Sequence, residues 1–279
     1  MTIKEFVSNH ALLVFIAVAY GLTWLIVLPL VLEGLGLIVL SDSLRVIHYV
    51  APTGPALAAI GVTFMKDGRS GLEDIGRRLS RWRVGAVWLF VSVMLVWVFY
   101  LGAAALIVLM RQAWPDIAMF GRVRYLPYVS FAGAWVLWIL TYGLGEETGW
   151  RGFLLPNLQS RYSALMSAIL VSLVWALWHA PFFFYDANLQ SMGLSGVVMW
   201  VIGMMFGSVM LTWLYNSTKG SILMVALWHG TYNLFTAAEG MATAMVATYI
   251  TIFLMVLVVS VATVYKPANL SNEERQTAG

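Results

Sequence analysis

The sequence predicts an all-α protein that crosses a membrane about eight times, and two observations carry that prediction. First, 61% of the 279 residues are hydrophobic and only 10% are charged, with a mean hydropathy of +0.83. A soluble domain carries about 25% charged residues, so this composition is typical of an integral membrane protein. Second, apolar runs of roughly 20 residues, the length of a membrane-spanning helix, recur along the chain.

These runs predict a single membrane-embedded domain over residues 1–279. The first run, from Ala11, is about as long as a full span, so we expect no cleavable signal peptide. The polar tail over residues 266–279 is expected to be solvated. The eight predicted spans are Ala11–Leu32, Ile47–Met65, Val84–Met110, Tyr128–Gly145, Ala164–Tyr185, Ser195–Tyr215, Ser221–Ala237 and Ala242–Tyr265.

The basic residues predict the orientation, because lysine and arginine are enriched in cytoplasmic loops. Placing both termini in the cytoplasm puts the six basic residues between Lys66 and Arg83 on that side. Few basic residues then lie on the opposite side, although Arg111, Arg122 and Arg124 fall together in one exterior loop. We therefore predict that both termini are cytoplasmic.

Residues 70–83 predict an amphipathic helix at the membrane surface. Leu72, Ile75, Leu79 and Trp82 recur at three- and four-residue intervals, so they share one face of a helix. Arginines occupy the other face, and such a helix binds the anionic headgroups of the cytoplasmic leaflet. Steering of a substrate is the alternative role for these arginines.

Composition also excludes several function classes. The chain has no cysteine, which removes disulfides and thiolate metal sites. The net charge is +3, but the basic residues lie in loops between apolar runs, so we expect no nucleic-acid partner. The expected partner is the lipid bilayer.

Two adjacent carboxylates, Glu146 and Glu147, follow the fourth apolar run. Ionisable groups near membrane depth are costly, so they point to function. On a helix the two side chains point about 100° apart, which predicts separate roles. Arg151 follows Glu147 by four residues, the spacing and order that favour an ion pair. That pairing leaves Glu146 as the candidate base; in the alternative, both carboxylates face water at the end of the span.

His179 lies 33 residues after Glu146, with a polar turn around Arg161 midway between them. A helical hairpin bent at that turn brings the two side chains to the same depth, provided that the fourth helix continues past Glu146. Pro181 is expected to end or bend the next helix just after the histidine. The alternative for His179 is a hydrogen-bonded packing residue.

His229 and Asn233 are four residues apart and share one face of the seventh span. Asparagine cannot titrate, but its amide both donates and accepts hydrogen bonds. Alone, the two residues predict only an interhelical hydrogen bond. Together with Glu146 and His179, they place glutamate, histidine and asparagine on three helices and predict a catalytic site.

This set of side chains permits two kinds of hydrolysis. A glutamate and a histidine can deprotonate a water that attacks an amide, while a second histidine and an asparagine stabilise the oxyanion. Alternatively, Glu146, His179 and His229 can hold zinc as a two-histidine, one-carboxylate site with an open position for water. The sequence alone leaves both open.

The sixth span carries Gly203 and Gly207, whose spacing predicts a close approach of a neighbouring helix. We expect this contact to press spans five to seven together around the polar side chains. A turn over residues 218–221 follows the span.

Together these motifs resemble the CAAX protease and bacteriocin-processing family of intramembrane proteases, whose eukaryotic branch is the type II CAAX prenyl endopeptidase. The resemblance covers about residues 140–235. The family usually has phenylalanine where this chain has Trp175, a change expected to alter only the packing beside His179. The four motifs are Glu146-Glu147-x-x-x-Arg151, an aromatic-x-x-x-His pattern closed by His179, Gly203/Gly207 with Thr218-Lys219-Gly220-Ser221, and His229-x-x-x-Asn233.

The resemblance implies roles for the site residues. Glu146 would be the water-activating base and His179 its partner. His229 and Asn233 would hold the oxyanion, and the predicted ion pair would support the site. The resemblance also implies a catalytic core at about residues 128–240, open to the cytosol and the membrane core.

The expected function is an intramembrane endopeptidase that cleaves a membrane-associated or prenyl-like peptide, in the cell membrane of a prokaryote. One alternative is a non-catalytic bacteriocin-immunity or scaffold protein of the same fold. A proton-coupled transporter that uses the glutamate and histidines as a relay is a further alternative.

Overall fold

Helices form the fold, as composition predicts. The computed structural model describes residues 2–110, 122–237 and 244–278, and Arg111 of the predicted exterior loop lies outside them. Within these ranges there is no β-strand, and Val123 and Leu126 form only an isolated bridge. The predicted all-α fold class is confirmed.

Among the described helical segments, η1, η2 and η6 are 3₁₀ turns, whereas η4 and η5 are π-helical. The first half contains α1 (Ile3–Asn9), α2 (Ala11–Gly34), α3 (Asp42–Arg45), η1 (Val46–Tyr49), η2 (Ala51–Thr53), α4 (Gly54–Leu79) and α5 (Ala86–Leu109). The second half contains α6 (Phe131–Trp138), η4 (Ile139–Glu146), α7 (Glu147–Gly149), η5 (Trp150–Leu154), α8 (Leu155–Gln159), α9 (Ala164–Trp178), η6 (Ala180–Phe184), α10 (Ala187–Gln190), α11 (Leu194–Ser217), α12 (Ile222–Thr236) and α13 (Ala244–Val264).

Six of the described helical segments are long and apolar enough to cross a membrane, and they correspond to predicted spans one, two, three, five, six and eight. A polytopic membrane protein is therefore confirmed. The other two predicted spans are also helical, as α6 with η4 and as α12. Helix α12 has 15 residues, or about 22 Å, and neighbouring helices bury most of it.

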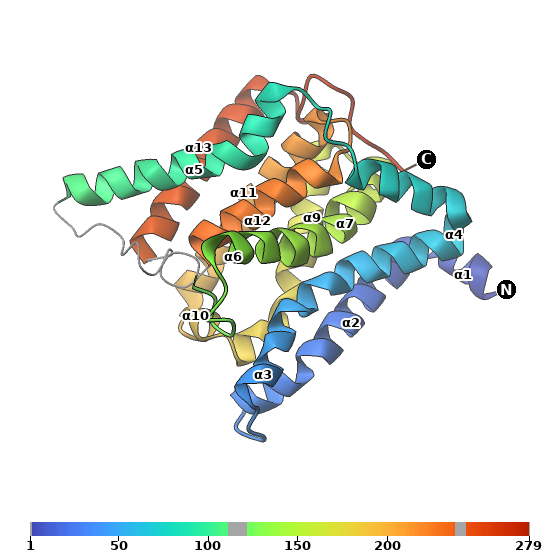
Figure 1. Cartoon of the computed structure of the whole chain (residues 1–279). Coiled ribbons are helices and arrows are strands. Elements are labelled where there is room, and N and C mark those ends of the chain that lie inside the picture. The colour runs from blue at the N-terminus through green and yellow to red at the C-terminus, as the bar shows by residue number, and fades with distance from the viewer. Residues whose placement is uncertain (1, 111–121, 238–243, 279) are drawn as a thin grey trace.

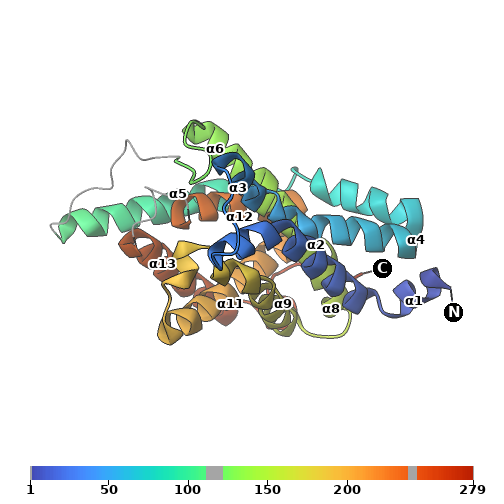
Figure 2. The same ribbon diagram turned by 90° about the horizontal axis from the view of Figure 1, so that it is seen from below.

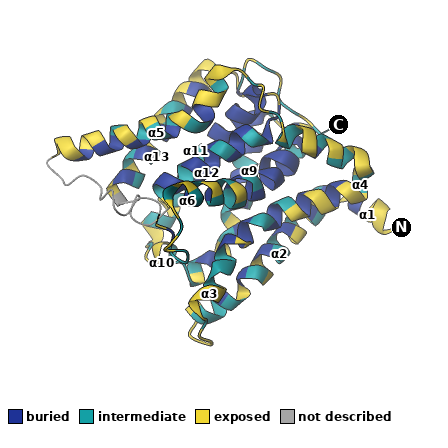
Figure 3. Cartoon of the chain, in the orientation of Figure 1, coloured by how far each residue is buried: buried dark blue, intermediate teal, exposed yellow. Residues whose placement is uncertain are grey.

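The helices that carry the predicted site lie in the middle of the bundle (Figures 1 and 2). Helix α2 packs against α4 on one flank, and α5 packs against α13 on the other. Figure 3 shows that buried residues concentrate in the central helices α7, α9, α11 and α12. Both termini lie at the same end of the molecule in both views, and their cytoplasmic location stays a prediction.

Serine side chains fix where three of the central helices begin. Ser130, Ser163 and Ser221 precede α6, α9 and α12, and each accepts a hydrogen bond from the backbone N–H three residues later. Such caps satisfy one of the free N–H groups of the first turn. At its other end α9 stops at Trp178, just before His179 and Pro181, close to the predicted position.

Gly68 separates the span formed by α4 from its amphipathic continuation. Its φ of 65° lies in the left-handed region, which glycine adopts because it has no Cβ. The continuation ends at Leu79, where the hydroxyl of Ser80 binds carbonyls of the last turn. The amphipathic helix predicted over residues 70–83 is therefore shorter than expected, and Trp82 lies outside it.

The polar tail packs against the bundle, which corrects the expectation that it is solvated. Leu270 is fully buried. The carbonyls of Pro267 and Ala268 accept hydrogen bonds from the first two N–H groups of α9, and the carbonyl of Asn269 accepts one from the side chain of Asn216. The first backbone N–H groups of a helix have no hydrogen-bond partner within the helix. The carbonyls of the tail supply those partners for α9.

Gly143 allows α12 to approach the fourth helix closely. A Cβ at this position would lie 2.5 Å from the carbonyl oxygen of Ala226, which is too short for a stable contact. The predicted close approach at Gly203 and Gly207 is wrong. A Cβ at Gly203 would make only an ordinary contact at 3.9 Å, and one at Gly207 would meet no atom within 4 Å. The close backbone contact lies beside the carboxylates and not in the sixth span.

We expect Gly143→Ala to destabilise the protein by about 1–3 kcal/mol, because α12 must move to admit the methyl group. Thermal unfolding of the detergent-solubilised protein measures the change. Gly207→Ala is the matched control, since it adds the same methyl group to open space and improves helix propensity. An equal loss in both variants would contradict the close approach at Gly143.

Candidate active site

The two glutamates lie where the fourth helix changes its winding. The π-helical segment η4 ends at Glu146, a single α-helical turn begins at Glu147, and the π-helical segment η5 contains Arg151. Short π-helical segments inside α-helices are frequent at functional sites. The helix continues to Gln159, so the predicted end of the span at Gly145 was too early and the condition for a hairpin with α9 is met.

Glu146, Glu147 and Arg151 are buried, with exposed fractions of 1%, 0% and 0%. The alternative in which both carboxylates face water is therefore wrong. Removing a charge from water without a partner costs several kcal/mol, so each of these groups needs a partner inside the protein.

The predicted ion pair is present, and Arg151 extends it to two further helices. Arg151 Nη1 donates to Glu147 Oε1 at 3.0 Å. Its Nη2 donates to the hydroxyl of Ser208 on α11 at 3.1 Å. The guanidinium carbon also lies 5.2 Å from the centre of the Trp175 ring on α9, a cation–π contact. Arg151 therefore holds the fourth helix against α11 and α9.

His229 is a second partner of Glu147, a contact that sequence reasoning missed. Its Nδ1 lies 2.7 Å from Glu147 Oε1, and since an ionised carboxylate only accepts, Nδ1 carries the proton. On the other side of the ring, Nε2 lies 3.1 Å from Asn233 Nδ2, so in the neutral histidine the amide donates to it. Glu147 thus orients His229, and His229 orients Asn233.

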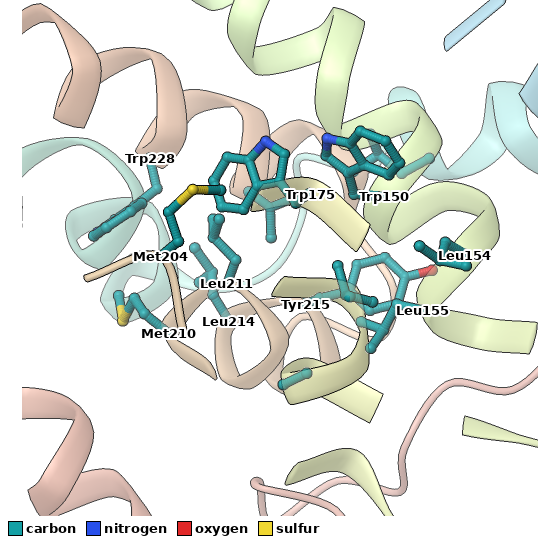
Figure 4. Close-up of a cluster of buried hydrophobic side chains, with 14 of the residues drawn as sticks. Trp150, Leu154, Leu155, Trp175, Met204, Met210, Leu211, Leu214, Tyr215 and Trp228 are labelled. Atoms are coloured by element: carbon teal, nitrogen blue, oxygen red, sulfur yellow. The ribbon is translucent and has the colours of Figure 1, made fainter. Parts of the chain in front are cut away.

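Two tryptophans hold Glu146 through one of its oxygens. Trp175 Nε1 donates to Glu146 Oε2 at 2.6 Å, and Trp150 Nε1 donates to the same oxygen at 3.3 Å. Figure 4 shows the two indole rings next to each other, with their nitrogens turned to the same side. The other oxygen, Oε1, has no hydrogen-bond partner among the described residues. Trp175 was expected to affect packing alone, and its N–H bond to the carboxylate corrects that expectation.

His179 is linked to Glu146 through Trp175, with no direct hydrogen bond between the two in the described structure. Its Nδ1 lies 2.8 Å from the backbone carbonyl of Trp175, which can only accept. The proton is therefore on Nδ1, and Nε2 keeps a free lone pair. The Trp175 ring centre also lies 6.0 Å from that of His179 and 5.3 Å from that of His229. Trp175 thus contacts the side chains of four predicted site residues, Glu146, Arg151, His179 and His229.

The geometry gives no support to the zinc alternative. The described ranges contain no group of three or more histidine, aspartate or glutamate side chains placed to hold a metal ion. His229 uses Nδ1 for Glu147 and Nε2 for Asn233, so neither ring nitrogen is free to bind a metal in this arrangement.

His48, which the sequence analysis did not single out, connects three segments beside the site. Its Nε2 lies 2.8 Å from the hydroxyl of Tyr142, one turn before Glu146, and its Nδ1 lies 2.9 Å from the hydroxyl of Tyr185. The contacts join η1, η4 and the end of η6. A single histidine between apolar residues carries no spacing signal that would have predicted this network.

Comparison with known proteins agrees with the motifs. Residues 128–235 match the family model described as type II CAAX prenyl endopeptidase, Rce1-like. The predicted resemblance is confirmed. All of the predicted site residues, from Glu146 to Asn233, fall inside the matched region.

A relative in the curated proteins points to the same kind of core. The chain is 30% identical over 93 residues to the protein named CAAX prenyl protease 2 of Methanococcus maripaludis. These residues make up 32% of this chain and 34% of that relative. The chain therefore matches about a third of the length of the relative.

We expect Trp175→Phe to destabilise the protein by about 1.5–3 kcal/mol, because it removes a hydrogen bond to a buried carboxylate and keeps an aromatic ring. Trp228→Phe is the matched control, since the Trp228 indole N–H is buried without a partner among the described residues. Thermal unfolding in detergent measures both. A smaller loss for Trp175→Phe than for Trp228→Phe would argue against the bond to Glu146.

Proposed function

We propose that the chain is a membrane-embedded endopeptidase that hydrolyses a peptide bond of a membrane-associated substrate. The observation that carries this proposal is the arrangement around Trp175. It leaves two basic atoms, Glu146 Oε1 and His179 Nε2, without partners among the described residues while the rest of each side chain is held fixed. Fixed groups with free lone pairs are what deprotonation of a water requires.

Glu146 is the proposed general base. Its Oε2 is occupied by two indole N–H groups, so the carboxylate cannot rotate freely and Oε1 is the oxygen that remains for a water. His179 Nε2 is a second acceptor for the same water, since the proton of this ring is on Nδ1. Two acceptors on one water orient one of its lone pairs for attack on a carbonyl carbon, and the proton that Glu146 takes from the water passes to the leaving amine when the C–N bond breaks.

His229 and Asn233 are the proposed oxyanion site. With one amide N–H of Asn233 donated to His229 Nε2, the second remains available to an oxygen that gains charge. Glu147, at 2.7 Å from His229 Nδ1, fixes the ring that in turn orients Asn233. Arg151 supports this arrangement through Glu147, without a direct part in the chemistry.

The proposed substrate is a peptide that carries a prenyl-like lipid. The relative from Methanococcus maripaludis is named a CAAX prenyl protease, and the site of this chain lies among membrane-spanning helices, where a lipid chain can reach it. We place the protein in the cell membrane of a prokaryote, with its termini and most of its basic residues on the cytoplasmic side.

We expect Glu146→Gln to lower cleavage by at least about a hundredfold, because the amide cannot take a proton from water. The assay is intact-mass analysis of a farnesylated peptide with a CAAX ending after incubation with the purified protein, with the same unlipidated peptide in parallel. Thermal unfolding checks that the variant is folded.

The matched control is Glu73→Gln, which removes an exposed carboxylate paired only with Arg69 among the described residues. It is expected to cleave as the parent protein does. Unchanged cleavage by Glu146→Gln would reject the proposed base, and no cleavage by any form would favour the non-catalytic alternative.

Removal of metal ions is expected to leave cleavage unchanged, because both ring nitrogens of His229 are bound to protein side chains. Dialysis against a chelator before the same peptide assay measures this. Loss of cleavage that zinc restores would show that the side chains rearrange to bind the metal.

A further inference from the structure

A second polar region, separate from the proposed active site, lies at the end of the bundle that holds the C-terminal tail. It is a cavity of about 270 Å³ between the two parts of α4, the start of α8, the turn after α11 and the tail. Figure 1 shows the end of the chain next to the last turns of α4. Pockets for drug-sized ligands usually measure about 300–1,000 Å³, so this volume suits a smaller group.

The lining of this cavity is strongly basic. Five lysines and arginines contribute to it, against two aspartates, Asp67 and Asp74. A concave surface with mainly positive charge focuses the electrostatic potential and attracts negatively charged groups. The expected occupant is therefore an anion. The five basic residues are Lys66, Arg77, Arg78, Arg81 and Lys219.

Asp74 neutralises only part of this charge. It forms ion pairs with both Arg77 and Arg78. Arg78 also donates to the hydroxyl of Tyr215 at 2.9 Å and to the carbonyl of Gly152 at 2.8 Å. Its Nε–H remains buried without a partner among the described residues. Arg78 is thus fixed by the protein and still has a donor to offer.

The remaining cations are weakly paired. Arg81 donates to the carbonyl of Lys219 at 2.5 Å and has no carboxylate partner among the described residues. Lys66 and Lys219 lie 3.5 Å from Asp67 and Glu273, longer than the distance of a strong charged hydrogen bond. The cavity therefore keeps a net positive charge and several free N–H donors.

Exposed apolar side chains lie close in sequence to the basic residues of this region. Phe64, Trp82 and Val87 are 58%, 56% and 68% exposed, and they flank the basic residues in the chain. The cavity is lined from both sides of Gly68, by Lys66 before it and Asp74 after it, where the apolar span of α4 gives way to its amphipathic part. A phospholipid has a charged headgroup at the membrane surface and acyl chains in the membrane core. Charged donors at the end of a span, with exposed apolar side chains near them in the chain, match these two parts of a lipid.

We propose that this cavity binds the phosphate-bearing headgroup of an anionic phospholipid. Arginine guanidinium groups match the geometry of phosphate oxygens, and three arginines line the cavity. The net positive lining disfavours a zwitterionic headgroup such as that of phosphatidylcholine, because its cationic group is repelled. A bound lipid bridges α4, α8 and the tail.

The test is native mass spectrometry of the full-length protein in a neutral detergent, titrated with dioleoylphosphatidylglycerol, dioleoylphosphatidylcholine or inorganic phosphate. Phosphatidylglycerol is expected to bind about tenfold more tightly than phosphatidylcholine. The variant Arg77→Gln/Arg81→Gln/Lys219→Gln, which leaves the buried Arg78 in place, is expected to weaken phosphatidylglycerol binding by about a hundredfold, or about fivefold for each cation removed.

The matched control is Lys4→Gln/Arg69→Gln/Arg161→Gln, which removes three exposed cations that do not line the cavity. Its affinity for phosphatidylglycerol is expected to change by less than about twofold. An equal loss in both triple variants would overturn the proposal, because the attraction would then be a general charge effect. Inorganic phosphate that displaces the lipid at equal concentration would also overturn it and assign the cavity to free phosphate.

Discussion

Burial of three charged side chains in an apolar bundle is the constraint on which the rest of the structure depends. Glu146, Glu147 and Arg151 are all enclosed, and one cation cannot balance two carboxylates. Polar donors from the same helix, from α9 and from α12 stabilise the carboxylates. Glu147 takes the guanidinium and the imidazole of His229, while Glu146 takes two indole N–H groups. The central helices are held in register by these bonds, because each donor comes from a position that must face the carboxylates.

The sequence predicted the parts of this arrangement that follow from position along a single helix. The pair between Glu147 and Arg151 depends only on a spacing of four residues, and the spans follow from runs of apolar residues. The same reasoning found both histidines, because a polar residue in an apolar helix is conspicuous. The glycines at 143, 145, 149 and 152 indicate close packing around the carboxylates, but they do not reveal that α12 is the helix that approaches Gly143.

The contacts between helices could not be predicted in the same way. Tryptophan looks like a packing residue in any periodicity analysis, and whether its N–H meets a carboxylate depends on the rotation of α9 against the fourth helix. The bond between His229 and Glu147 depends likewise on the depth of α12. The prediction for the tail was wrong for a related reason. Its composition is polar, but its partners are backbone N–H groups at the start of α9 and buried side chains such as Asn216, and composition does not reveal them.

The two hydrogen bonds of Trp175 also determine how the site responds to a movement of α9. Its indole holds Glu146, and its own backbone carbonyl holds His179, so one residue sets the positions of both proposed water-binding groups. A shift of α9 along its axis therefore carries the carboxylate anchor and the imidazole together. Because Glu146 belongs to the fourth helix, such a shift weakens its bond to Trp175 and displaces His179 at the same time, so the site is expected to be assembled or disassembled as a unit.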